Sequence, residues 1–282
     1  MLRRGDGRSM AYRQLGHGRP VVCLAGGPGA NAEYLEDLAG LDSDHELIVP
    51  DWRGTGDSEP ALTPTGQGFD VLSNDLEILR AHLGFDAMNV LAHSAACTTT
   101  IVYAAAHPTR LSSLVLVTPS RWLYEAVEDD TEAIMHRRAD APWYSDAMAA
   151  QARLNEGADP EEIPSLLARL GPASYARWGE REQTHAAKMV PHQVDAVRRF
   201  WNARVDGEKV RARLGLVDAP VLIITGGLDA ATGVNAGRAW AEAFPNGRHE
   251  NIPESGHIPW VDEPDTFASL VREFLGKAVR HR

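Results

Sequence analysis

Short apolar runs alternate along the chain with longer segments in which apolar residues recur at helical spacing. Short runs of β-branched and aliphatic residues are typical of buried strands. The strand-like runs are Ser9–Gln14, Val21–Leu24, Glu46–Pro50, Met88–Ala92, Leu114–Thr118, Val221–Thr225 and Arg248–Ile252. The helix-like segments include Phe69–Leu83, Ser94–His107, Val234–Phe244 and Asp265–Ala278.

The segment Phe69–Leu83 illustrates the helical pattern. Leu72, Leu76, Leu79 and Leu83 recur at spacings of three or four residues, which gives one apolar face. Strands that are apolar throughout belong to sheets buried on both faces, and the helices between them supply the covering layers. The pattern predicts an α/β fold with a mostly parallel central sheet and helices on both faces.

One long segment, 119–208, breaks this alternation. It shows helical periodicity without strand-like runs, for example at Val190, Val194, Val197 and Trp201. We expect a helical cap at 119–208, inserted into a core formed by 1–118 and 209–282. The cap is rich in aromatic residues, which either pack the cap on the core or line an apolar substrate pocket. They are Trp122, Trp143, Trp178, Trp201, Tyr124, Tyr144 and Tyr175.

The charge and composition of the chain argue against some classes of binding partner. The chain has 282 residues and a formal net charge of -11, which argues against nucleic acid and anionic membranes as partners. No run approaches the roughly 18 apolar residues of a membrane span, and the N-terminus lacks the apolar stretch of a signal peptide. Cys23 and Cys97 lie in apolar runs, so we expect buried thiols without a disulfide, and a cytoplasmic protein.

The most informative local pattern is Ala92-His93-Ser94-Ala95-Ala96, where an apolar strand runs directly into a helix. A serine on such a strained turn projects its hydroxyl from the sheet edge, and small residues two positions before and after it allow strand and helix to approach. The usual pattern, G-x-S-x-G, has glycine where this chain has Ala92 and Ala96. We predict that Ser94 is a nucleophile.

A nucleophilic serine needs a base and an acid that orients the base. His257 lies in a loop after the last strand-like run, and Asp229 follows the buried run Val221–Thr225. The strand ending at Thr118 offers no competing carboxylate. Ser94, Asp229 and His257 therefore form the predicted triad, in a chain order known for such triads.

The glycine-rich turn Ala25-Gly26-Gly27-Pro28-Gly29 follows an early strand and completes the set. Backbone N–H groups in such a turn stabilise a developing oxyanion, and we expect Gly27 and Ala95 to donate them. The turn lacks G-x-G-x-x-G spacing and a phosphate-loop lysine, which argues against a nucleotide site. We expect no cofactor and no metal.

In these motifs the sequence resembles the α/β-hydrolase superfamily, and within it the proline iminopeptidase group. The resemblance spans nearly the whole chain outside the cap, and implies a serine hydrolase in which Arg53 and Asp57 support loops beneath the site. The matching segments are Gly26–Gly29, Asp51–Ser58, the Ser94 turn, Gly226 with Asp229, and Gly256-His257 followed by Glu263, Pro264 and Phe267.

The sequence departs from that group at positions near the predicted site. The group usually has histidine where this chain has Ala25, and glycine and tryptophan where it has His93 and Ala95. The group also carries cap glutamates that pair with a free amine, and Glu180 or Glu182 is a candidate, with solvated helix charges as the alternative. The predicted substrate-binding residues are Glu180, Trp178, Trp143, Trp122 and His93.

Three functions stay open at this point. The first is a serine hydrolase that acts on an ester, amide or peptide through an acyl-enzyme. The second is a lyase, cyclase or thioesterase of secondary metabolism on the same scaffold, and the third is a binding protein with the hydrolase fold. In each case the expected partner is a small molecule or short peptide.

Overall fold

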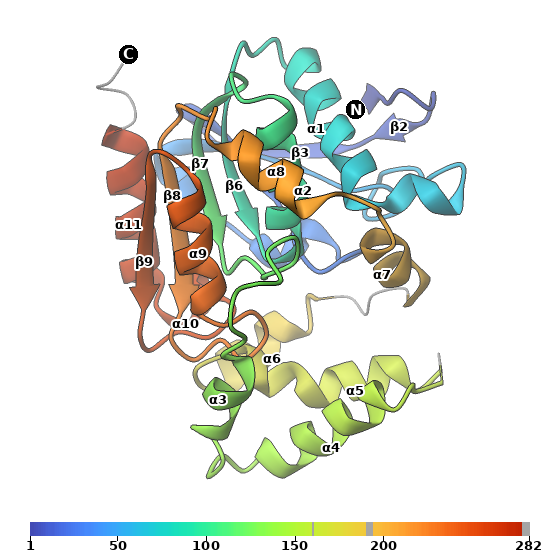
Figure 1. The fold of residues 1–282 in the computed structure, drawn as a ribbon, viewed down its shortest axis with the longest axis vertical. Helices are drawn as coiled ribbons and strands as arrows, with labels where there is room; N and C mark the ends of the chain where they lie inside the picture. Colours follow the sequence, from blue (N-terminus) through green and yellow to red (C-terminus); the bar gives the residue numbers. More distant parts are fainter. Residues whose placement is uncertain (160, 190–193, 278–282) are drawn as a thin grey trace.

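The computed structural model describes residues 1–159, 161–189 and 194–277. Within these residues a seven-stranded sheet has the order β3-β5-β4-β6-β7-β8-β9 (Figure 1). All neighbouring strands are parallel except β3 and β5, so the predicted mostly parallel sheet is confirmed. The strands are β3 (Tyr12–Gly16), β4 (Arg19–Leu24), β5 (His45–Pro50), β6 (Met88–His93), β7 (Leu111–Val117), β8 (Val221–Gly226) and β9 (Gly247–Ile252).

The predicted strand Ser9–Gln14 is wrong as a single element. It is divided at Ala11 into β2 (Ser9–Met10), which pairs with β1 (Leu2–Arg3) in a separate small sheet, and β3. At Ala11 the backbone N–H donates to Ser58 Oγ at 2.9 Å, and the carbonyl accepts from the Asp51 N–H at 3.0 Å. These bonds to the 51–58 loop take the place of strand pairing.

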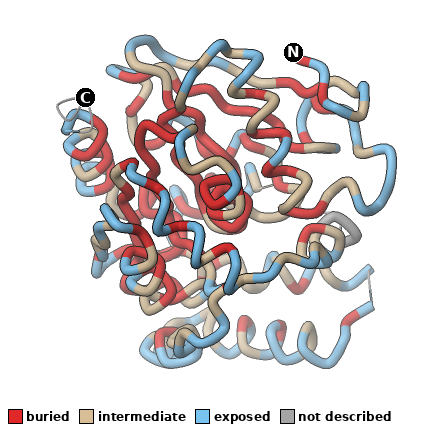
Figure 2. The backbone as a smooth tube through the Cα atoms, turned by 45° about the horizontal axis from the view of Figure 1, so that its top comes forward, coloured by how far each residue is buried: buried red, intermediate tan, exposed pale blue. Residues whose placement is uncertain are grey.

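Alternate side chains of the strands face two apolar layers. Val90 and Ala92 of β6 join one cluster, whereas Leu91 between them joins the other. Figure 2 shows the burial concentrated in the sheet and the inner faces of its covering elements. The first layer contains α1 (Phe69–His82), α2 (Ala95–Ala106), α8 (Gly207–Leu214) and α9 (Asn235–Ala243); the second contains α10 (Pro259–Asp262), α11 (Pro264–Lys277) and the short helices η1 (Ala32–Leu35) and η2 (Leu41–Ser43).

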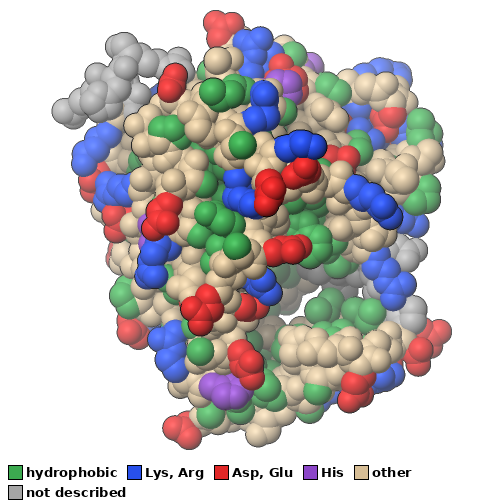
Figure 3. Space-filling model, in the orientation of Figure 1, with side chains coloured by type: hydrophobic (Ala, Val, Ile, Leu, Met, Phe, Trp, Pro, Cys, Tyr) green, Lys and Arg blue, Asp and Glu red, His purple; other side chains and the backbone are tan. Residues whose placement is uncertain are grey.

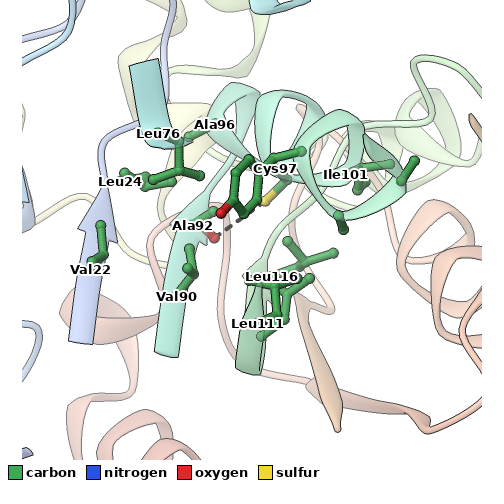
Figure 4. Packing of buried hydrophobic residues seen from close by; sticks show 14 of the residues in the cluster. Val22, Leu24, Leu76, Val90, Ala92, Ala96, Cys97, Ile101, Leu111 and Leu116 are labelled. Atoms are coloured by element: carbon green, nitrogen blue, oxygen red, sulfur yellow. Dashed lines mark hydrogen bonds between the residues drawn. The ribbon is translucent and has the colours of Figure 1, made fainter. Parts of the chain in front are cut away.

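Helix α2 packs directly on β6 and β7 (Figure 4). Ala96, Cys97 and Ile101 lie over Ala92 and Leu116, and the Cys97 thiol donates to the Ala92 carbonyl at 3.3 Å. Alanine at 92 and 96 leaves little side-chain bulk between helix and strand, which supports the predicted close approach. Cys97 and Cys23 are buried free thiols, as expected.

Between β7 and α8, the described residues contain helices and no strand. The helices between residues 131 and 186 form a layer beneath the sheet in Figure 1, and Met135, Ala147 and Ala173 form a small apolar cluster of their own. The helices described between β7 and α8 are α3 (Thr131–His136), α4 (Tyr144–Asn155), α5 (Ile163–Leu170), η4 (Gly171–Ser174), α6 (Glu180–Ala186) and α7 (Val194–Trp201).

The division into a core and a cap at 119–208 stays a prediction. Phe200 of α7 joins the apolar cluster of the core, and α8, which contacts α2, already begins at Gly207. Val190, part of the predicted apolar stripe, lies outside the described residues, as does Ala278 at the end of the predicted last helix. Among the described helices, none has the length and apolar character needed to cross a membrane.

Candidate active site

Ser94 occupies the sharp turn between β6 and α2. Its φ of 54° and ψ of -123° lie in a region that residues with side chains rarely adopt. The turn is packed against Gly26, where a Cβ atom would lie 2.7 Å from Ser94 Cβ and 2.4 Å from the His93 carbonyl oxygen. Glycine is therefore required at position 26 for the glycine-rich turn 25–29 to approach the serine.

Ser94, His257 and Asp229 form a continuous hydrogen-bonded set. His257 Nε2 lies 2.9 Å from Ser94 Oγ, and His257 Nδ1 lies 2.9 Å from Asp229 Oδ2. Ser94 follows β6, Asp229 follows β8 and His257 follows β9, so three parallel strands deliver them to one edge of the sheet. Sequence reasoning thus named three residues that the fold brings together.

The Asp229 carboxylate is fully buried and bonded at both oxygens. Oδ1 accepts from the N–H groups of Ala231 at 2.8 Å and Thr232 at 3.2 Å, and Oδ2 accepts from Thr232 Oγ1 at 2.6 Å. Burial raises the pKa of Asp229, but the charge and hydrogen bond of His257 and these donors outweigh it, so its pKa lies below the ordinary value. Asp229 is held as an anion with one lone pair toward His257.

The His257 loop is anchored to the helical layer. The His257 N–H donates to the Ser174 carbonyl at 2.7 Å. Beside it, the buried Asp262 carboxylate accepts from the N–H of Gly256 at 2.7 Å and from the N–H of Ala176 at 3.1 Å. Asp262 thus joins the loop of His257 to the segment after η4.

Asp262 gives the fold a defined pH dependence. Burial raises the pKa of Asp262 to about 6, and the Glu182 charge adds to this, although the N–H donors and Arg138 oppose it. Between its ordinary pKa of 3.8 and about 6, the folded chain keeps a proton that the unfolded chain releases. The contribution of Asp262 to the free energy of unfolding therefore falls as pH rises through this window.

We expect Asp262→Asn, which cannot ionise, to gain thermal stability relative to wild type as pH rises from 4 to 7. The measurement is Tm against pH for both proteins, with Asp265→Asn at an exposed position as the control. Parallel Tm curves for Asp262→Asn and wild type would contradict the assignment.

The glycine-rich turn 25–29, which holds the predicted oxyanion donor Gly27, is fixed from two sides. The Gly26 N–H donates to Tyr34 Oη at 2.6 Å, and Trp52 Nε1 donates to the Ala25 carbonyl at 2.9 Å. Within the described part of the chain, no protein acceptor is bonded to the N–H of Gly27 or of Ala95. Both groups are free for a ligand, which is what the predicted oxyanion donors require.

A small cavity of about 20 Å³ lies beside this loop, lined among others by Gly26, Pro28, Ala95, Trp52 and Phe200. Figure 3 shows the surface also hollowed between the sheet-bearing part and the layer of α4 and α5.

His93 does not fit its predicted role as a substrate contact. Its ring is 1% exposed, and both nitrogens are occupied: Nδ1 by Tyr34 Oη at 2.7 Å and Nε2 by the His257 carbonyl at 3.0 Å. Burial and the nearby charge of His257 hold the pKa of His93 well below its ordinary value, against the opposing effect of the hydrogen bond to the His257 carbonyl. His93 is therefore a neutral group inside the protein.

The two glutamates predicted to bind substrate have different surroundings. Glu180 is exposed and lines a groove with Glu36, Arg181 and Thr184, while the Glu182 carboxylate accepts from the Gly179 N–H at 2.8 Å and caps α6. The Glu182 carboxylate is thus occupied by the helix cap. Glu180 faces solvent, which fits the alternative that these glutamates are solvated helix charges.

The three tryptophans have packing partners of their own. Trp178 packs on Tyr175, with ring centroids 5.6 Å apart. Trp143 lies under the Arg138 guanidinium, 4.5 Å from its carbon to the ring centre. Trp122 is 42% exposed and packs against Trp201, with the ring centroids 4.7 Å apart and the rings tilted. The contacts of Trp178 and Trp143 favour packing, whereas Trp122 also lines an open pocket beside α8.

Arg53 has the supporting place that the resemblance implies. Its guanidinium binds the buried Asp75 carboxylate through two hydrogen bonds of 2.6 and 2.7 Å and also contacts Asp6 at 3.2 Å. Asp57 is different, because it is exposed and contributes its backbone N–H to Asp51 Oδ2 at 3.1 Å. Asp51 is the carboxylate that ties this loop.

The residues whose hydrogen bonds hold Ser94, His257 and Asp229 in place were not identified from the sequence. Thr232 has a local signal, since a threonine three residues after an aspartate often bonds back to its carboxylate. Tyr34, Ser174 and Asp262 act through contacts with residues far away in the chain. No local pattern marks them.

Comparisons with known proteins agree with the fold described above. The family model of the alpha/beta hydrolase fold matches residues 19–264. A proline iminopeptidase of Heyndrickxia coagulans is 23% identical over 274 residues, which cover 94% of this chain and 93% of the relative. The predicted resemblance to the proline iminopeptidase group is thereby confirmed.

Two solved structures show the same fold. The esterase RhEst1 of Rhodococcus sp. ECU1013 aligns with a TM-score of 0.72 at 24% identity, covering 96% of each chain. The esterase EaEST of Exiguobacterium antarcticum aligns with a TM-score of 0.72 at 19% identity, covering 96% of this chain and 97% of its own. At these identities the likeness is evidence for the fold alone.

Proposed function

Because the chain belongs to the alpha/beta hydrolase fold family, we propose that it is a serine hydrolase that cleaves a carboxylic ester or amide through an acyl-enzyme. The observation that carries the proposal is the placement of His257, whose two ring nitrogens lie 2.9 Å from Ser94 Oγ and 2.9 Å from Asp229 Oδ2. Distances of this size allow direct proton transfer between serine and imidazole.

The acylation step follows from this geometry. Ser94 Oγ attacks the substrate carbonyl carbon while His257 Nε2 takes its proton, and the carbonyl oxygen becomes an oxyanion. The Gly27 and Ala95 N–H groups stabilise that charge; loss of one such donor typically costs about 3 kcal/mol of barrier. Collapse of the tetrahedral intermediate breaks the bond to the leaving group, which receives the proton from His257.

Deacylation repeats these roles with water. His257 takes a proton from water, the hydroxide attacks the acyl carbon, and the proton returns to Ser94 Oγ as the acid product leaves. Asp229, an anion by its lowered pKa, stabilises the imidazolium in both halves and holds the tautomer with the proton on Nδ1.

Esters are the favoured substrate class. A free amine needs a carboxylate that faces the reacting centre, but Glu182 caps α6 and Glu180 is exposed in a separate groove. The proline iminopeptidase relatives support the second candidate, an aminopeptidase.

We expect wild type to hydrolyse short-chain p-nitrophenyl esters and to turn over prolyl- and alanyl-arylamides far more slowly. The measurement is kcat/KM for each substrate, with Glu180→Ala as the matched variant. Glu180→Ala is expected to change none of these values, because its carboxylate faces solvent. A preference for arylamides, together with a raised KM in Glu180→Ala, would support the aminopeptidase instead.

A further inference from the structure

Buried hydrogen bonds connect the oxyanion loop to the backbone of the proposed base. The Gly26 N–H meets Tyr34 Oη at 2.6 Å, Tyr34 Oη meets His93 Nδ1 at 2.7 Å, and His93 Nε2 meets the His257 carbonyl at 3.0 Å. We call Tyr34 and His93 together the strut. It begins next to Gly27 and ends at His257, passing beside Ser94.

Only one arrangement of protons satisfies every bond in the strut. The His257 carbonyl can only accept, so His93 Nε2 carries the proton, and Nδ1 of the neutral ring then accepts. Tyr34 therefore donates its hydroxyl proton to His93 Nδ1 and accepts from the Gly26 N–H. Each bond fixes the direction of the next.

The strut is sealed from solvent. Tyr34 is 0% exposed and His93 is 1% exposed. The Trp260 ring packs against both, with its centroid 4.8 Å from that of His93 and 6.1 Å from that of Tyr34. Water cannot replace a lost bond here without a change in packing, so removal of one partner leaves a buried polar group unpaired.

Helix α6 and the residue after η4 extend this support. His185 Nε2 donates to the Tyr34 carbonyl at 2.7 Å, and Tyr175 Oη donates to His185 Nδ1 at 2.8 Å. The pair Tyr175 and His185 thus holds the Tyr34 backbone, while the Tyr34 hydroxyl bonds His93.

We propose that Tyr34 and His93 are positioning residues that hold the oxyanion donor loop and the general base in register around Ser94. This role rests on the proposed function. The Gly26 N–H is bonded to the Tyr34 hydroxyl. This bond orients the next peptide so that the Gly27 N–H stays free. The His257 backbone is held at its carbonyl by His93 and Thr118 and at its N–H by Ser174.

The test uses three variants and one control in the full-length protein. Tyr34→Phe keeps the ring and removes the hydroxyl, and His93→Phe removes both nitrogens. His93→Gln retains an acceptor and a donor at a similar separation. Tyr103→Phe is the matched control, because Tyr103 is also a buried tyrosine, but its hydroxyl bonds Glu77 between α1 and α2.

We expect Tyr34→Phe and His93→Phe to lower kcat for p-nitrophenyl acetate roughly 10- to 100-fold, as small misplacements of catalytic groups do, while KM stays near wild type. The rate of fluorophosphonate labelling at Ser94 should fall in parallel, and His93→Gln should recover most of both losses. Thermal unfolding identifies folded variants, and Tyr34→Phe carries the test if His93→Phe does not fold.

Failure of the positioning role and failure of the proposed function give different results. If wild type labels at Ser94 but folded Tyr34→Phe has the kcat of Tyr103→Phe, the strut has no positioning role. The same conclusion follows if His93→Gln is as slow as His93→Phe. If wild type neither labels at Ser94 nor hydrolyses esters, the proposed function is wrong and the positioning role is overturned with it.

Discussion

Ser94→Ala is expected to lower kcat for ester hydrolysis by roughly six orders of magnitude, the size of loss seen when a serine nucleophile is removed from a complete triad. The variant keeps Asp229, His257 and the free N–H groups, yet no acyl-enzyme can form without Oγ. Alanine fits the turn, since Ser94 already places a Cβ atom there and the change removes Oγ alone. We therefore expect substrate binding and thermal stability to stay near wild type.

The measurements are single-turnover ester cleavage, fluorophosphonate labelling and Tm. Thr100→Ala is the control, because its buried hydroxyl lies in the same helix and donates to the Ala96 carbonyl at 2.8 Å. Retained turnover of the natural substrate in Ser94→Ala would favour the lyase or cyclase alternative, in which His257 and Asp229 act as a base without an acyl-enzyme. Full labelling of the variant would exclude Ser94 as the nucleophile.

Asp229→Asn is expected to lower kcat about 10⁴-fold, the effect of the same change in a well-studied serine protease triad. Two backbone N–H groups, of Ala231 and Thr232, bind Oδ1 and require an acceptor there. The asparagine oxygen will remain at these donors, so its NH₂ group will face His257 Nδ1. That contact favours the tautomer with the proton on Nε2, which cannot accept the proton of Ser94.

The kinetic signature follows from this tautomer. Folded Asp229→Asn should show a low kcat with little change in KM, and slow fluorophosphonate labelling at Ser94. Asp146→Asn on α4 is the control, since it removes a surface ion pair with Arg169. A wild-type kcat in Asp229→Asn would show that the buried carboxylate does not orient the base.

The sequence predicted the parts of the fold and site that depend on local pattern. Continuous apolar strands predicted the mostly parallel sheet, and the strand-to-helix change at Ser94 predicted the sharp turn. Loop residues directly after strands predicted Asp229 and His257, because parallel strands bring their carboxyl ends to one edge. The partition of Ser9–Gln14 was missed because the bonds at Ala11 come from residues 51–58.

The supporting contacts could not be predicted in this way. Tyr34 and His93 are 59 residues apart, and His257 lies a further 164 residues along the chain from His93. The same limit applies to His93, which is predicted from the sequence to contact the substrate. Burial decides its role, and burial is a property of the folded packing. In the cap, aromatic residues suited a packed layer and a pocket equally well.

The bond from the His257 N–H to the Ser174 carbonyl has a consequence for protein engineering. Exchange of the insertion between related hydrolases is an attractive route to new specificity, since it leaves the sheet and the triad sequence intact. Here the segment 119–208, the predicted insertion, also supplies a backbone anchor for the proposed base, and Ala176 supplies another through Asp262. A chimera that replaces 119–208 as one block would alter turnover together with selectivity, so the grafting junctions should leave residues 174–176 with the parent scaffold.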